Sequence, residues 1–284
     1  FLMSNRLDDL QTGINIMSAI IDKPINFSIT HKKDSGFKNL NNVEIYNIKG
    51  VHPSGNESFQ INKIDPLNFG ETIWVIKPED LSNIGAFFRT GVFSSSRTVA
   101  ISGDSLKSPK YYSTVIGASI SSLINSDDMN DIKNYRFING DPLSGSKVEY
   151  SEFLGFYNNS LSVIEEGNQY RMLGWLPFMY NSVPSFSKTS FSWLLGGAKK
   201  VNTNLNGEER AIVVTGEMEK YFPMDIFPMQ LIKACMRGDI EKMESLGIYE
   251  VIPEDFGLVD FSCTSKIEAQ EIIKSGIQIM LKEV

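Results

Sequence analysis

The chain has 284 residues, and at about 150 residues per domain this length favours two domains. Hydrophobic residues make up 42% and charged residues 21%, a balance typical of a globular protein and not of a disordered or repetitive one. The 27 Lys and Arg against 34 Asp and Glu leave a net charge of −7, which argues against nucleic-acid binding because that needs a clustered cationic face. No apolar run nears the roughly 18 to 20 residues that span a bilayer, so we expect any membrane role to come through a partner.

Cysteine and histidine are scarce, and this excludes much metal and redox chemistry. The chain has two of each, Cys235, Cys263, His31 and His52. Two Cys cannot supply the four thiolates of an iron–sulfur cluster, and no pair has zinc-ligand spacing. So few Cys in a long chain also indicate a reducing compartment without a disulfide framework.

The first predicted element is an amphipathic helix over residues 4–20, with apolar residues at helical spacing. The chain begins inside this helix, without an initiator Met and without a signal-peptide pattern. We therefore expect an N-terminally truncated fragment of a longer protein, whose N-terminal functions are not represented here.

Strands and helices alternate in the first third of the chain. Strands are predicted at 25–30, 43–48 and 72–76, because these segments alternate or carry β-branched residues. Pro78 and the carboxylates after it suit the start of a helix, since Pro fixes φ and the acids meet the positive end of the dipole. Residues 1–93 are therefore predicted to form an α/β domain.

A β-grasp domain is predicted over residues 94–147. The pattern is a hairpin of strands at 97–102 and 110–115, a short helix at 118–124, and a returning strand at 135–138.

Residues 148–206 are predicted to form a β-rich hairpin and linker. Their expected strands lie at 148–157, 161–165 and 170–176, with turns at the Asn and Gly residues between them.

Residues 207–284 are predicted to form a domain of four helices. Helical spacing covers 224–237, and Gly238 suits the C′ position. Three more helices follow, with start signals at Asp239, at Pro253, and at a capping box of Ser265 and Glu268.

Several short motifs have structural explanations. The segment 140–147 resembles a phosphate-binding loop, but its Lys147 does not directly follow the last Gly, so a turn is the better interpretation. Arg237-Gly238-Asp239 is explained by a helix stop followed by a helix start. Neither G-x-G-x-x-G nor G-x-S-x-G occurs, and the sequons at residues 26, 56 and 158 lack a secretory signal.

The candidate acid–base groups are His52 and two carboxylate groups. Both carboxylate groups have a polar, turn-like context, which favours a solvated surface over acid–base chemistry. His52 follows a strand without a visible partner, so a structural role is favoured over a catalytic one. The carboxylates in question are Asp127, Asp128 and Asp131 in one group and Glu165 and Glu166 in the other.

Two stretches rich in Met and aromatic residues are candidate binding surfaces. Residues 221–229 either pack a helical core or face a partner or a quinone, and the core is favoured. Residues 175–180 and Phe186 lie in a loop-like context, where exposed apolar side chains often mark docking surfaces.

A set of short segments, in order along the chain, resembles the NqrA proteins of Na⁺-translocating NADH:quinone reductases. The segments cover nearly the whole chain, and the collinear set is more specific than any member. They are His52-Pro-Ser-Gly, Asp65-Pro-Leu, Ile116-Gly-Ala-Ser, Leu143-Ser-Gly, Gly174-Trp175, Phe186-Ser-Lys-Thr, the run 210–228, Arg237-Gly-Asp and Glu244-Ser-Leu-Gly-Ile.

The resemblance implies an α+β multidomain fold. The relatives, which include the RnfC protein of the Rnf complex and the flavin-binding protein of complex I, have a Rossmann-like domain, a β-grasp domain and a helical iron–sulfur domain, in the order predicted above. In the Rnf relative two Cys motifs precede Pro-Met-Gly and Pro-Ser-Lys segments. At the matching positions here, 217–224 and 251–266, only Cys263 remains. We therefore expect a domain resembling an α-helical ferredoxin without clusters.

The function implied is that of a peripheral subunit on the cytoplasmic face of the bacterial inner membrane. The complex oxidises NADH, reduces quinone and exports Na⁺ by means of flavins and iron–sulfur centres. We expect this chain to carry no cofactor or metal, to be inactive alone, to dock on the membrane-embedded subunits, and to contribute to quinone binding. We assign no catalytic residue, and Gln60 and Asn62 stand where the family commonly has His-x-His.

Two alternatives stay open. In the first alternative the chain is an electron-transfer protein similar to the RnfC protein, or it binds flavin. Flavin binding would require a glycine-rich phosphate loop in a part of the protein outside this sequence. Otherwise it is a stand-alone ligand-binding module built on the β-grasp unit.

Overall fold

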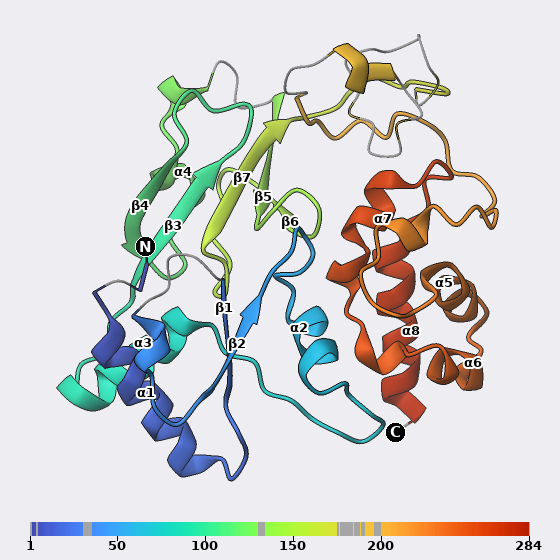
Figure 1. Cartoon of the computed structure of the whole chain (residues 1–284). Coiled ribbons are helices and arrows are strands. Elements are labelled where there is room, and N and C mark those ends of the chain that lie inside the picture. Colours follow the sequence, from blue (N-terminus) through green and yellow to red (C-terminus); the bar gives the residue numbers. More distant parts are fainter. Residues whose placement is uncertain are drawn as a thin grey trace. The chain divides into compact units, whose positions relative to one another are not determined.

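The computed structural model describes residues 2–3, 5–30, 36–129, 134–174, 176, 184, 188, 191–195 and 200–283, and these divide into two compact units. Unit 1 covers Phe1–Ser95 and unit 2 covers Ser96–Val284 (Figure 1). Within the described ranges, no helix combines the length and apolar composition that crossing a bilayer requires. The fold is α+β with a mixed sheet, as expected. The finer domain types and boundaries stay predictions.

Unit 1 packs helices against a small parallel sheet. Strands β1 and β2 pair with Asn26 opposite Glu44, and the core beneath them is formed by apolar residues of α1, β1 and α3. The predicted first helix, the first two strands and the helix beginning at Pro78 are therefore confirmed. The elements are α1 (Leu7–Ile20), β1 (Asn26–Thr30), η1 (Phe37–Asn39), β2 (Glu44–Ile48), α2 (Glu57–Ile64) and α3 (Pro78–Thr90).

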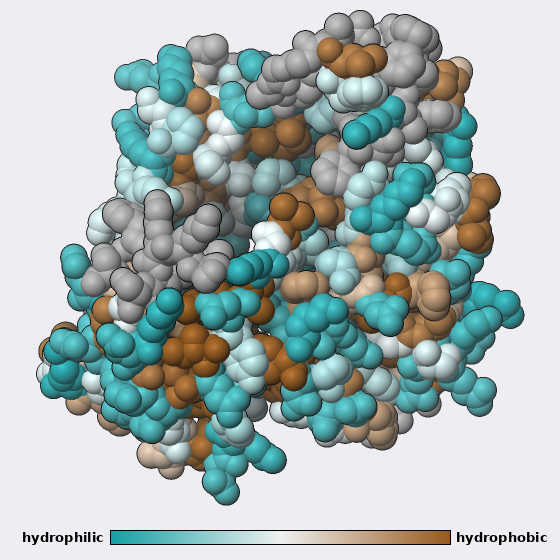
Figure 2. Space-filling model, in the orientation of Figure 1, coloured by the Kyte–Doolittle hydropathy of each residue, from teal (hydrophilic) through white to brown (hydrophobic). Residues whose placement is uncertain are grey.

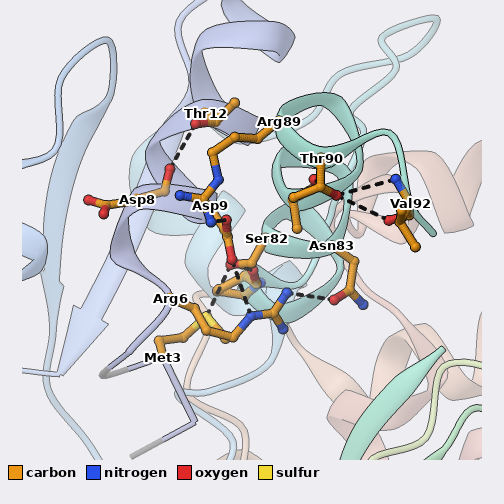
Figure 3. Close-up of polar contacts among 12 residues, drawn as sticks. Met3, Arg6, Asp8, Asp9, Thr12, Ser82, Asn83, Arg89, Thr90 and Val92 are labelled. Atoms are coloured by element: carbon orange, nitrogen blue, oxygen red, sulfur yellow. Dashed lines mark hydrogen bonds and ion pairs between the residues drawn. The ribbon is translucent and has the colours of Figure 1, made fainter. Parts of the chain in front are cut away.

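Helices α1 and α3 approach closely because glycines face each other between them. A Cβ on Gly85 would overlap the carbonyl oxygen of Asp9, and one on Gly13 would overlap that of Leu81. Polar contacts line the same interface (Figure 3). Arg6 Nη2 donates to Asn83 Oδ1 at 2.7 Å, and Arg89 pairs with Asp9 at 2.6 Å. Close backbone packing, one ion pair and one side-chain hydrogen bond thus join the two helices.

The strand predicted at 72–76 is wrong. Residues 71–77 have no regular secondary structure, and Trp74 is 88% exposed. Strand propensity is expressed only when a neighbouring strand and a packed face are available. In the part of the chain that the structure describes, no strand pairs with this segment.

Unit 2 contains a five-stranded mixed sheet in the order β4-β3-β7-β5-β6. Strands β3 and β7 are parallel, with Ala100 opposite Ser160, and the other pairs are antiparallel. The short helix α4 packs Ile120 and Leu123 into the core of this sheet. The elements are β3 (Ser96–Ser102), β4 (Lys110–Val115), α4 (Ile120–Leu123), η2 (Ser126–Asp128), β5 (Tyr135–Asn139), β6 (Ser146–Val148) and β7 (Ser160–Glu165).

The strand predicted at 135–138 is confirmed as β5, and the strand that pairs with β3 on its other side is β7. Residues 161–164 of β7 are all buried, which is typical of a strand covered on both faces in the middle of a sheet. Two other expectations fail: in 148–157 only Val148 belongs to a strand, and the described residues of 170–176 form no strand. The five-stranded sheet therefore contains strands from before and after residue 147, where a domain boundary was predicted.

Four α-helices follow residue 207 in the described ranges, as predicted. Gly238 ends α5 with φ of 63°, and the Asp239 side chain caps α6 by accepting from the Lys242 N–H. Buried side chains of α5, α6, η7 and α8 form the core. The short turn η4 (Phe191–Leu195) precedes this region. The elements of the region are η5 (Met218–Lys220), α5 (Pro228–Arg237), α6 (Ile240–Ser245), η6 (Ile248–Glu250), η7 (Pro253–Phe256), α7 (Gly257–Ser262) and α8 (Ala269–Glu283).

The capping box predicted for the last helix is wrong. Asp260 on α7 accepts from the Ala269 N–H at 2.6 Å and from the Gln270 side chain at 2.9 Å. The Ser265 hydroxyl instead donates to the Ala211 carbonyl at 3.1 Å. A carboxylate from a neighbouring helix thus satisfies the free N–H groups that a local box would otherwise cap.

Candidate functional site

The Met- and aromatic-rich stretch 221–229 lies in the helical core. Phe222, Met224 and Met229 are at most 6% exposed, whereas Phe227 is 60% exposed. This burial favours the core interpretation over a surface that faces a quinone or a partner.

The resemblance to iron–sulfur relatives, combined with ferredoxin spacing, indicates which residues would stand at cluster-ligand positions. Bacterial ferredoxins use the run C-x₂-C-x₂-C-x₃-C-P, and its fourth Cys ligates the other cluster. This run can be placed twice on the chain. In the first placement Pro223 follows the fourth ligand position, and in the second placement Thr264 stands where the proline would be. The ligand positions are then Ile212, Thr215, Met218 and Phe222 in the first run, and Pro253, Phe256, Val259 and Cys263 in the second.

Two of these positions lie together in the fold. Phe222, at the fourth position of one run, lies against Phe256, at the second position of the other, with ring centroids 4.8 Å apart. Those two positions would serve the same cluster in a two-cluster ferredoxin. Phe256 and Val259, at two of these positions, are fully buried apolar side chains.

The residues present therefore do not fit an iron–sulfur cluster. Cys263 is a buried free thiol, and the seven other positions carry no thiolate. Burial raises the pKa of the Cys235 thiol to about 11, which keeps it protonated at neutral pH. In the described ranges, no group of three or more His, Cys, Asp or Glu side chains is placed to hold a metal.

Residues 140–145 form a turn between β5 and β6, as predicted, and this turn contacts α8. The Asp141 carboxylate accepts from the Leu143 N–H at 2.8 Å and from the Ser144 N–H at 3.1 Å. These donors are therefore bound within the turn instead of facing a phosphate. The Leu143 carbonyl accepts from Gln270 Nε2 at 2.9 Å, which ties the sheet to α8 within unit 2.

His52 belongs to unit 1, and the two carboxylate groups belong to unit 2. His52, in unit 1, is exposed. Glu165 is exposed as expected, but Glu166 is not simply solvated. Arg136 donates to both oxygens of Glu166, at 2.6 and 2.8 Å, and this pairing lowers the pKa of the carboxyl. Asp131 and His31 lie outside the described residues.

The second candidate surface is described only in part. Residues 175, 177–180 and 186 lie outside the described residues. Trp193 in η4 is described and 50% exposed, and sequence analysis did not place it in this surface. If aromatic residues after residue 186 had also been considered, Trp193 would have been part of this candidate surface.

Comparison with known proteins gives the family. The model described as the NqrA second alpha/beta domain matches residues 1–93, and the NQRA C-terminal domain matches residues 98–150. The NqrA protein of the Na⁺-translocating NADH-quinone reductase of Neisseria meningitidis serogroup C is 31% identical over 277 residues, which are 97% of this chain and 62% of the relative. The chain belongs to the NqrA family.

Other NqrA relatives agree. The NqrA proteins of Haemophilus influenzae (strain PittGG) and Rhodopirellula baltica are 32% and 29% identical, over 97% and 99% of this chain. The chain spans 61% and 62% of these two NqrA proteins, so it corresponds to less than two thirds of each.

Proposed function

We propose that this chain acts within the NqrA component of a Na⁺-translocating NADH:quinone reductase, the complex that couples NADH oxidation and quinone reduction to Na⁺ export. The observation that carries this proposal is the match to NqrA proteins over 97% of the chain. In this role the chain is a peripheral component at the cytoplasmic face of the inner membrane, and it docks on the membrane-embedded subunits.

Co-purification tests this assignment. The tagged chain is expressed in the native host, and detergent-solubilised membranes are passed over the affinity resin. Recovery of the other reductase subunits, together with Na⁺-stimulated NADH oxidation in the eluate, is the expected result. Recovery of the chain as a free monomer, with the other subunits in the flow-through, contradicts the proposal.

In this proposal the chain carries no redox cofactor and serves as a scaffold. Support comes from the ligand positions, where Phe222, Phe256 and Val259 have buried apolar side chains in place of thiolates. The purified chain is expected to be colourless and free of iron and acid-labile sulfide. Flavin absorbance that survives gel filtration would instead favour an electron-transfer protein.

Quinone binding is the finer part of the proposal, and the family resemblance motivates it. The exposed indole of Trp193 provides a reporter. Titration of a short-chain quinone should quench tryptophan fluorescence saturably, and a strictly linear inner-filter decrease would count against quinone binding by this chain.

A further inference from the structure

The connection between β6 and β7 in unit 2 carries three large aromatic side chains in solvent (Figure 1). Residues 149–157 of this connection are here named the aromatic loop. Phe153 is 65%, Phe156 58% and Tyr157 69% exposed. On the face of the molecule in Figure 2, apolar side chains lie in patches among hydrophilic ones, and single exposed apolar residues are common in proteins. Three aromatic side chains so close in sequence form a cluster instead, and such a cluster indicates a contact surface.

The backbone of the aromatic loop is fixed to the rest of unit 2. Leu154 is 2% exposed, and its N–H donates to the Ala118 carbonyl at 2.9 Å. Arg97 Nη1 donates to the Phe156 carbonyl at 2.7 Å. The rings of Phe156 and Tyr157 pack edge to face, with centroids 4.9 Å apart. A partner therefore meets a surface that is ordered before binding, which lowers the entropic cost of association.

The aromatic loop is also acidic. From residue 148 to residue 159 the chain has Glu149 and Glu152, both exposed, and no Lys or Arg. The Glu152 carboxylate accepts from the Glu149 N–H at 2.7 Å, which holds it in the loop. Lys147 lies 2.9 Å from Glu149, but both side chains are more than half exposed, and such a pair contributes little and can exchange its partner.

Aromatic rings and carboxylates attract the same kind of ligand. The face of an aromatic ring carries negative charge density and binds Lys and Arg side chains, as a carboxylate does. The aromatic loop therefore fits a cationic polypeptide. An anionic lipid surface or a nucleic acid would be repelled by its two carboxylates.

We propose that the aromatic loop binds a Lys- and Arg-rich cytoplasmic loop of a membrane-embedded subunit of the reductase. This inference rests on the proposed function, which puts the chain against those subunits at the cytoplasmic face. Membrane proteins have an excess of Lys and Arg in their cytoplasmic loops, so the required cations are present on that side of the bilayer. The cationic side chains lie on the three aromatic rings and pair with the two carboxylates.

Photo-crosslinking in the assembled complex tests the contact. Phe156→p-benzoylphenylalanine is introduced into the tagged chain in the native host, and membranes are irradiated before purification. Mass spectrometry should locate the cross-link in a Lys- and Arg-rich cytoplasmic loop of a membrane-embedded subunit. Trp74→p-benzoylphenylalanine, at a position in unit 1 that is 88% exposed, should leave that loop unmodified.

Rebinding measures the contribution of each feature. Membranes stripped of the chain by high salt are mixed with purified 284-residue chain, and sedimentation gives the apparent Kd. Phe156→Ser with Tyr157→Ser should raise the Kd by roughly tenfold or more, because central aromatic residues dominate binding at interfaces. Glu149→Gln with Glu152→Gln should raise the Kd about fivefold and reduce its dependence on salt.

Matched controls lie in unit 1. Trp74→Ser removes an exposed aromatic side chain, and Asp22→Asn with Asp65→Asn removes two exposed carboxylates. These variants should rebind like the parent. Circular dichroism checks that all variants fold, and the cross-link reports on the contact without removing the loop.

Four results would overturn the proposal. They are a cross-link from position 156 only to a second copy of this chain or to lipid, equal losses in the unit 1 controls, unchanged rebinding of the aromatic-loop variants, and equally tight binding of the chain to protein-free vesicles of phosphatidylethanolamine and phosphatidylglycerol. In each case the chain can still co-purify with the other reductase subunits. Failure of the proposed function abolishes that co-purification, so the two failures are distinguishable.

Discussion

At the scale of single residues, Asp260 links two helices by capping α8 from α7. Its carboxylate accepts from the Ala269 N–H and from the Gln270 side chain, and Gln270 also holds Leu143 in the sheet part of unit 2. Asp260→Ala should lower the free energy of unfolding by about 1 kcal/mol, because the first N–H groups of α8 lose their acceptor. Urea unfolding followed by circular dichroism measures this, with exposed Ser275→Ala as the control.

The pH dependence at Asp260 has a definite sign. Burial raises the pKa of this carboxyl, although its hydrogen bonds from Gln270 and from the backbone N–H groups of Ala269 and Gln270 act in the opposite direction. The folded state therefore binds more protons than the unfolded state above the ordinary Asp range, and stability from this group falls as pH rises through that window. Asp260→Asn removes this titration, so the stability of the parent relative to Asp260→Asn should fall from about pH 4 upward. If the stability of the parent relative to Asp260→Asn instead rises with pH, the pKa of Asp260 is not raised in the folded state.

At the scale of elements, the contact between α5 and α8 depends on Gly276. A Cβ there would lie 2.5 Å from Cys235 Sγ and 3.3 Å from Met243 Sδ. Gly276→Ala gains about 1 kcal/mol of helix propensity but overpacks the core by about 1 to 3 kcal/mol, so a net loss of about 1 kcal/mol is expected. Urea unfolding should show this loss, and Cys235→Ala in the same chain should recover part of it. Equal losses with and without Cys235 would show that the sulfur is not the obstacle.

The exposed segment 71–77 tests the corrected strand prediction. Because these residues have no strand partner in the described part of the chain, their amide protons should exchange with solvent within seconds to minutes. The amides of the central strand β7 should be protected far longer. Hydrogen exchange with mass spectrometry compares the two, and equal protection would indicate that the segment pairs with a strand.

Local signals found many elements of this fold, and two of the failures share one cause. Helices α1, α3 and α5 have apolar stripes in their own sequence, Pro78 marks the start of α3, and Gly238 ends α5 as expected. The strand at 72–76 and the capping box at Ser265 failed because partners elsewhere in the chain decide both outcomes. The candidate site shows the same limit: spacing locates Phe222 and Phe256, but only the structure brings their rings together.

At the scale of the whole molecule, the chain has two compact units with separate cores. Unfolding should therefore proceed in two steps, since domains usually unfold as units. Each unfolding step can be assigned to one unit by replacing a glycine of that unit with alanine, because the added methyl group would clash with neighbouring atoms. Gly85 lies in unit 1, where its Cβ would overlap the Asp9 carbonyl oxygen, and Gly276 lies in unit 2.

Differential scanning calorimetry on the two glycine variants distinguishes the steps. Gly85→Ala should cost about 2 kcal/mol and lower only one transition, by about 10 °C, because small units lose more Tm for the same free energy. Gly276→Ala should lower only the other transition, by a few degrees, because unit 2 is larger. A single transition shifted by both variants would mean that the units unfold cooperatively. Two separate shifts would mean that the NqrA second alpha/beta domain keeps its stability independently of the sheet and helices that follow it.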